Sequence, residues 1–211
     1  MITIKRFKRI EALLRQAGYG SSIDWSENIP KPADADAFAQ EAIYVICNSG
    51  FRNSVAVPVF KRCMAALKVG ASASTEFGHE GKHQAIDQIW ADREMLFAAY
   101  QAEEDKIVFL RGLRWIGPVT AYHLFKNLGG DHAKPDVHME RLARRDRTTT
   151  HLLCRRLARL TGYKVATIDT VLWRACESGV LNSARYEADG WSAAFRPQQF
   201  LDRHGLQIGA G

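Results

Sequence analysis

A glycine–proline turn in the middle of the chain has the residues to hold a phosphate group. Gly117 lets the backbone approach another group closely, and Pro118 suits the first position of a helix because no N–H is needed there. The N–H groups of Val119 and Thr120 would then point outward from the start of that helix, where a phosphate oxygen can accept them. Three basic side chains near the turn would add positive charge: Arg111, Arg114 and Lys126.

A carboxylate follows this turn, at the start of another predicted helix. Asp136 comes directly after Pro135, and Lys134 lies two positions before it. The simplest interpretation is that Asp136 caps the helix that begins at the next residue.

The two features together resemble the DNA-glycosylase superfamily that is named after its helix-hairpin-helix, its Gly/Pro-rich loop and an aspartate. The residues that carry the resemblance are Leu110, Leu113, Ile116-Gly117, Thr120-Ala121 and Leu124, then Gly129-Gly130 and Lys134-Pro135-Asp136-Val137-His138. The resemblance implies two helical domains that flank a DNA-binding cleft, with the active site where Asp136 and the hairpin meet. It also implies that backbone carbonyls of the hairpin can hold a monovalent cation when DNA is bound.

Two positions depart from the family pattern. Trp115 stands where the hairpin usually has a glycine, so it must avoid a positive φ or accept strain. Val119 stands where bifunctional members, such as those similar to endonuclease III, carry the lysine that attacks the sugar. The resemblance therefore implies a monofunctional enzyme, similar to 3-methyladenine DNA glycosylases, that releases a free base and leaves an abasic site.

The implied reaction gives Asp136 a catalytic role that is compatible with capping. Cleavage of a base–sugar bond passes through a positively charged, oxocarbenium-like sugar. A carboxylate can stabilise that charge and take a proton from the attacking water. Lys134 is the candidate for a lyase step if the chain proves to be bifunctional, and it otherwise joins the predicted DNA-binding residues.

Chemistry on a base in duplex DNA requires the base to leave the stack. By its position in the family, the turn after an early helix would fill the gap with Asn48 or Phe51, while Arg52 meets a phosphate. The alternative is an ordinary helix–helix turn with Phe51 in the core. The candidates for the base pocket are Trp25, Glu41, Tyr44, Trp115 and Tyr122, although aromatic residues at helical spacing are more often core residues.

Helical periodicity predicts the elements that must position these residues. We expect one helix over 5–17, one around 36–48, and another that follows the break at 48–50 and ends at about 69. Further helices are expected over a long stretch that includes 86–100, on both sides of Gly117, and over 136–145, 150–160 and 168–176. Asp169 would cap the last of these. We expect loops over 21–37 and 70–81, and low order from Glu187 onward. The predicted fold is all-α, with a helical barrel over 36–135 that holds the hairpin at 109–128, and a second domain formed by 1–35 and 136–211.

Composition excludes several classes of protein. The 211 residues are 46% hydrophobic and 25% charged, which is typical of a globular domain and not of a disordered or fibrous chain. The four cysteines are too scattered for a zinc ribbon or an iron–sulfur cluster, so we expect buried free thiols, no metal and no cofactor. No long apolar run indicates a membrane span, and we expect a cytoplasmic monomer, associated with the nucleoid if the source is prokaryotic.

The net charge of +6 favours a polyanionic partner, which we expect to be double-stranded DNA. The sequence thus predicts a monofunctional DNA glycosylase that flips out a damaged or modified base and hydrolyses its N-glycosidic bond. An alkylated purine is the favoured base, and a bulky modified cytosine is a second candidate. The alternatives are a non-enzymatic DNA-binding module that uses the hairpin, and a bifunctional glycosylase/lyase.

Overall fold

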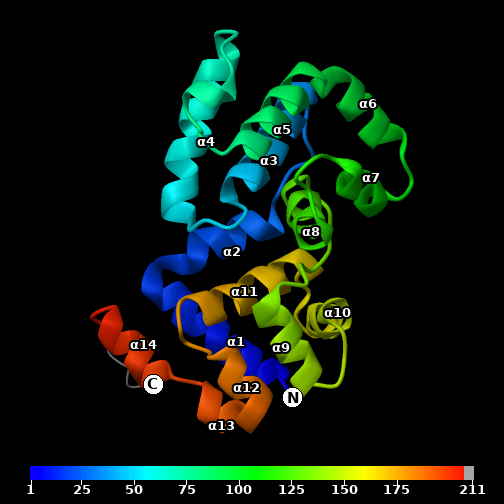
Figure 1. The fold of residues 1–211 in the computed structure, drawn as a ribbon. Coiled ribbons are helices and arrows are strands. Elements are labelled where there is room, and N and C mark those ends of the chain that lie inside the picture. The colour runs from blue at the N-terminus through cyan, green and yellow to red at the C-terminus, as the bar shows by residue number, and fades with distance from the viewer. Residues whose placement is uncertain (207–211) are drawn as a thin grey trace. The chain divides into compact units, whose positions relative to one another are not determined.

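The described part of the chain, residues 1–206, consists of helices joined by short loops (Figure 1). In this computed structural model no β-strand occurs among residues 1–206, so the fold class is all-α, as predicted. Within the same residues, no helix combines the length and the apolar character needed to cross a membrane. All four cysteines are buried and free of disulfides, which confirms the expectation for the thiols.

Two units, each with its own hydrophobic core, make up the chain. The first combines Met1–Ile29 with Asp131–Gly211, of which residues 207–211 lie outside the described part, and the second is Pro30–Gly130. The sequence placed these boundaries five or six residues later, before residue 36 and after residue 135.

The first unit is built around a helix that is buried along most of its length. Every residue from Val165 to Leu172 is buried, so this helix carries apolar residues on more than one face. Phe7, Ile10 and Leu14 recur at helical spacing and bury one face of the first helix in the same core. The helices of this unit are α1 (Ile4–Leu14), α2 (Gly20–Glu27), α9 (Val137–Arg145), α10 (Thr150–Thr161), α11 (Val165–Glu177), α12 (Ser183–Asp189), α13 (Trp191–Ala194) and α14 (Pro197–Arg203), with a π-helical turn η1 (Arg15–Tyr19) after α1.

The second unit is organised around α3 (Ala35–Asn48), which packs against helices on several sides. Asp34 caps α3 by accepting a hydrogen bond from the Ala37 N–H at 2.7 Å, which satisfies one of the free donors at the start of the helix. The other helices are α4 (Asn53–Lys68), η2 (Ala73–Thr75), α5 (Glu80–Ala91), α6 (Arg93–Ala102), α7 (Lys106–Gly112) and α8 (Pro118–Asn127). The long helix predicted to include 86–100 is divided into α5 and α6 at Asp92.

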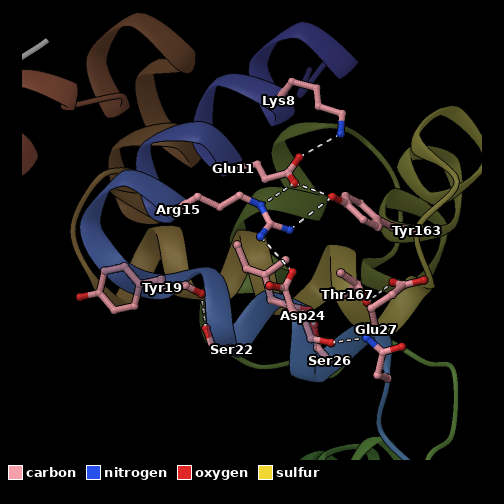
Figure 2. A network of polar contacts seen from close by, with 12 residues as sticks. Lys8, Glu11, Arg15, Tyr19, Ser22, Asp24, Ser26, Glu27, Tyr163 and Thr167 are labelled. Atoms are coloured by element: carbon pink, nitrogen blue, oxygen red, sulfur yellow. Dashed lines mark hydrogen bonds and ion pairs between the residues drawn. The ribbon is translucent and has the colours of Figure 1, made fainter. Parts of the chain in front are cut away.

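The loop predicted over 21–37 is partly wrong, because its first residues form α2. Tertiary contacts hold this polar segment as a helix, as Figure 2 shows. The Glu27 carboxylate accepts hydrogen bonds from the Thr167 hydroxyl at 2.6 Å and from the Lys164 N–H at 3.1 Å. Arg15 bridges Asp24 and Glu11, whose carboxylate also accepts from the Tyr163 hydroxyl at 2.6 Å.

The prediction of low order from Glu187 onward is also wrong within the described residues. Two short helices, α13 and α14, follow α12, and Phe200 and Leu201 are fully buried in the core of the first unit. The tail is rich in glycine and polar residues, but its few apolar residues are buried in the core and order the segment.

Candidate nucleic-acid interface and carboxylate site

A short turn joins α7 to α8 and carries the residues predicted to hold a phosphate. The Ile116 N–H donates to the Leu113 carbonyl at 3.0 Å, and Gly117 is the extended N-cap residue of α8. The Thr120 hydroxyl accepts from the Gly117 N–H at 2.7 Å and so closes the first turn of the helix. Pro118 occupies the first helical position, as predicted.

The start of α8 leaves donors that a phosphate can use. The first helical hydrogen bond runs from the Ala121 N–H to the Gly117 carbonyl at 2.9 Å. The N–H groups of Val119 and Thr120 precede that bond and, within residues 1–206, donate to no backbone or side-chain acceptor. Every helix start leaves such donors, so their presence makes phosphate binding feasible without requiring it.

Two of the three basic residues assigned to this turn are exposed. Arg111 and Arg114 lie at the surface, and an Nη of Arg114 donates to the Gln84 side chain at 2.7 Å. Lys126 does not fit the assignment, because only 8% of it is exposed. It also lies near the far end of α8, about 10 Å along the axis from Val119 at 1.5 Å per residue.

Trp115 adopts a positive φ of 66°. Of the two outcomes expected at this position, the strained conformation is therefore the one that occurs. Its ring lies edge-on to His79, with ring centroids 5.0 Å apart. The ring also lies directly over Gly81, where an added Cβ would come within 2.7 Å of it. These contacts with the start of α5 support the turn.

Glu41 and Tyr44, two residues predicted for a base pocket, lie on the side of α3 that faces α8. The Glu41 carboxylate accepts from the Asn127 side-chain amide at 2.9 Å, and burial raises the pKa of Glu41 despite this bond. The Tyr44 ring lies edge-on to His123, with centroids 6.3 Å apart, and its hydroxyl donates to Asn53 at 2.8 Å.

The remaining pocket candidates are more scattered. Tyr122 is half-buried on α8, whereas Trp25 belongs to α2 of the first unit and is 48% exposed. Within the second unit, the structure therefore brings Glu41 and Tyr44 together with α8.

The turn between α3 and α4 carries the predicted wedge residues. Phe51 is 45% exposed, so the alternative that placed it in the core is wrong. Asn48 is half-buried and its carbonyl accepts from the Phe51 N–H at 3.2 Å, whereas Arg52 is exposed. The surface position of Phe51 and Arg52 is compatible with a DNA contact.

Lys82 of α5 packs against this turn, and the sequence pattern did not identify this residue as part of the site. It is 3% exposed, its ammonium donates to the Ser49 carbonyl, and it lies 4.6 Å from the centre of the Phe51 ring. Burial lowers the pKa of Lys82. The available signal was its register: Lys82 precedes Ile86 and Ile89 at helical spacing, on the apolar face of α5.

Asp136 is the N-cap of α9, as the simpler interpretation predicted. One carboxylate oxygen accepts from the N–H groups of His138 at 3.0 Å and Met139 at 3.1 Å. The other oxygen lies 3.5 Å from the Lys134 ammonium, and the Asp136 side chain is 15% exposed. The capping bonds fix the carboxylate, and the second oxygen has a cation as its neighbour.

Lys134 and the loop before α9 are fixed by α11. The Lys134 N–H donates to the Asp169 carboxylate at 3.1 Å, and the Lys134 ammonium lies 5.4 Å from the centre of the Trp173 ring. Asp169 is 1% exposed and lies within α11, so its predicted role as a helix cap is wrong. Its carboxylate instead anchors the backbone two residues before Asp136.

Comparisons of the chain with family models, with curated proteins and with solved structures found no match. Among the residues that the structure describes, no three or more His, Cys, Asp or Glu side chains gather as a metal site would require. The local chemistry of the two units is thus the basis for a functional proposal.

Proposed function

We propose that the protein is a monofunctional DNA glycosylase that hydrolyses the N-glycosidic bond of a damaged or modified base. The observation that carries the proposal is the carboxylate of Asp136, which is held by two backbone N–H groups and remains partly exposed. A pure DNA-binding module gains nothing from such a carboxylate, because it repels the phosphate backbone.

The proposed reaction needs a carboxylate with a fixed orientation. Water attacks C1′ of the sugar, the bond between C1′ and the base nitrogen breaks with its electrons going to the base, and the water loses a proton. Asp136 stabilises the positive charge that develops on the sugar and accepts that proton. Because its capping oxygen is already bound by His138 and Met139 N–H groups, the oxygen next to Lys134 is the one that can act.

The turn between α7 and α8 supports the DNA-binding part of the proposal. It offers the N–H groups of Val119 and Thr120 to a phosphate, and Arg111 and Arg114 are exposed beside it. Val119 has no nucleophilic group, which favours hydrolysis over a Schiff-base reaction at this position. An alkylated purine is the first base to test, and a bulky modified cytosine is the second.

A bifunctional glycosylase/lyase is the second candidate, and one observation favours it. The Lys134 ammonium lies 3.5 Å from the Asp136 carboxylate, so an amine and a carboxylate occur together. The Lys134 ammonium is already engaged with the Asp136 carboxylate and lies 5.4 Å from the centre of the Trp173 ring, so it would have to leave these contacts to attack a sugar carbon. Hydrolysis is therefore preferred.

Asp136→Asn is the variant that tests the proposal, because asparagine caps helices about as well as aspartate. Duplexes that each carry one alkylated, deaminated, oxidised, mismatched or hypermodified base would be incubated with the protein and analysed with and without alkali. We expect strand breaks only after alkali, a fall in base release of about 10²–10⁴-fold in the variant, and DNA binding that is unchanged or tighter.

Asp34→Asn is the matched control, since it makes the same change at the N-cap of α3. We expect it to release base at the rate of the unmodified protein. Cleavage without alkali would assign a lyase and direct attention to Lys134. If no duplex loses a base but some bind tightly and in a salt-sensitive way, the protein is a binding module and Asp136 is only a cap.

A further inference from the structure

A cavity of about 720 Å³ in the first unit is lined by four arginines. Its lining residues come from α9, α12, α14, the end of α11 and the segments that join these helices. Among the described residues that line it there is no aspartate or glutamate. The charged and polar groups that matter for the argument are Arg141, Arg185, Arg196, Arg203, His138 and Ser183.

Two of the arginines are positioned by contacts within the unit. The Arg203 Nε donates to the Gln199 carbonyl at 3.0 Å, and its guanidinium lies across Gly179, where an added Cβ would be 3.0 Å from Nη1. Arg141 lies 3.7 Å from the Glu187 carboxylate. These contacts hold two positive groups at the cavity wall, and a side chain at position 179 would displace one of them.

The other two arginines have no such contacts. Within residues 1–206, no acceptor or carboxylate pairs with the guanidinium groups of Arg185 and Arg196. Both side chains line the cavity and keep all their donors for another molecule. His138 stands at the same wall, and its Nδ1 lies 2.8 Å from the hydroxyl of the buried Ser183, a contact that fixes the ring.

The chemistry of the cavity indicates its ligand. Positive charges gathered in one concavity repel one another, and an anion that enters relieves that repulsion. The planar guanidinium fork matches the oxygens of a phosphate better than a compact halide or a neutral sugar. The volume lies in the range of ligand sites, which leaves room for one or a few phosphate groups with what they are attached to.

We propose that this arginine-lined cavity is a phosphate-binding site. The phosphate can belong to a small phosphorylated molecule or to the backbone of DNA, and both sources present the same oxygens to the guanidinium groups. The site uses neither the turn at Gly117 nor the Asp136 carboxylate. The inference therefore stands apart from the proposed base release and survives if that reaction is not found.

The test uses the full chain, with inorganic pyrophosphate and an undamaged duplex as probes. Arg185→Gln/Arg196→Gln removes the two guanidinium groups that have no hydrogen bond or ion pair within residues 1–206, so the fold should persist. Arg155→Gln/Arg159→Gln makes the same charge change at two exposed positions of α10, outside the cavity. Circular dichroism checks the folding of both variants, and Arg185→Lys/Arg196→Lys keeps the charge but removes the planar fork.

We expect pyrophosphate to bind the unmodified protein and the α10 variant, and to bind the glutamine cavity variant at least tenfold more weakly, with an intermediate loss for the lysine variant. If DNA supplies the phosphate, the cavity variant also binds duplex more weakly, and its slope of log K against log salt falls by about 1–2 relative to the control. If a small molecule supplies it, duplex binding is unchanged. No pyrophosphate binding together with equal effects of both glutamine variants on duplex binding would overturn the proposal.

Discussion

Within residues 1–206, the Glu41 carboxylate accepts one hydrogen bond, from the Asn127 side-chain amide, and it is largely removed from water. Burial raises its pKa above the ordinary value of 4.5. The folded protein therefore binds a proton at Glu41 more readily than the unfolded chain does. As the pH rises from 4.5 through the raised pKa of the folded state, the free energy of unfolding decreases. A carboxylate that costs stability at neutral pH is also a candidate for function.

Glu41→Gln tests this cost. Glutamine keeps an acceptor for Asn127 but carries no charge, so we expect an increase of about 1 kcal/mol in the free energy of unfolding at pH 7–8. The advantage should disappear below pH 4.5, where both carboxyl and amide are neutral. Urea unfolding across this pH range measures it, with Glu104→Gln, an exposed carboxylate of the same unit, as the control. A loss of stability at pH 7 would contradict the prediction.

Predictions for single residues were correct where the surroundings of the residue are set by the neighbouring sequence. Asp136 was predicted as an N-cap because capping involves only the next few residues, and the structure confirms it. Burial of Lys126 and Lys82 depends on what packs against α8 and α5, which the local pattern does not contain. The role of Asp169 was missed for the same reason, since its partner, the Lys134 N–H, lies far away in the sequence.

Among the elements, helices with a clear apolar face were predictable and those held by distant contacts were not. Apolar spacing predicted α3 and α10, and α10 ends at Gly162, which adopts a left-handed conformation. In contrast, α2 has a weak apolar pattern. Hydrogen bonds from Thr167 of α11, and from Lys164 directly before α11, hold Glu27 and so keep α2 in place. Prediction from periodicity fails where tertiary hydrogen bonds replace a local hydrophobic signal.

In one of the contacts between α5 and the turn that joins α7 to α8, the Trp115 ring lies directly over Gly81. Gly81→Ala would place a Cβ about where the Trp115 ring now lies, at 2.7 Å, so the ring must move. Alanine stabilises a helix relative to glycine by about 0.5–1 kcal/mol. This gain offsets the cost of moving the ring, so the free energy of unfolding should change little. We expect duplex DNA binding to weaken severalfold because the turn is displaced.

Fluorescence anisotropy with a labelled duplex measures that loss, and urea unfolding measures stability. Gly112→Ala is the matched control, since a Cβ at the end of α7 would meet no atom within 4 Å. It should leave binding unchanged. Equal binding by the Gly81 variant and the unmodified protein would remove this turn from the DNA interface.

At the scale of the whole molecule, the second unit is one continuous stretch of chain and the first is made from two. Each unit has its own core, with Phe38, Ile43 and Ile46 among the fully buried residues of the second. A resemblance in sequence suggested two domains, but only contacts could place the boundaries near Ile29 and Gly130. Composition does not change sharply at either point, because the same kinds of helix lie on both sides.

A chain cut to residues 30–130 should therefore fold alone, whereas residues 1–29 and 131–211 should require each other. We expect the 30–130 fragment to show a helical circular dichroism spectrum and a single cooperative unfolding transition, since its core contains no residue from outside. It keeps the turn at Gly117 but lacks the cavity arginines and the other basic residues of the first unit, so it should bind duplex DNA more weakly than the full chain. Because it also lacks Asp136, it should release no base. Phe38→Asp in the fragment, which buries a charge in that core, should abolish the transition. A fragment without cooperative unfolding would mean that the second core is insufficient by itself, and base release by the fragment would remove Asp136 from the reaction.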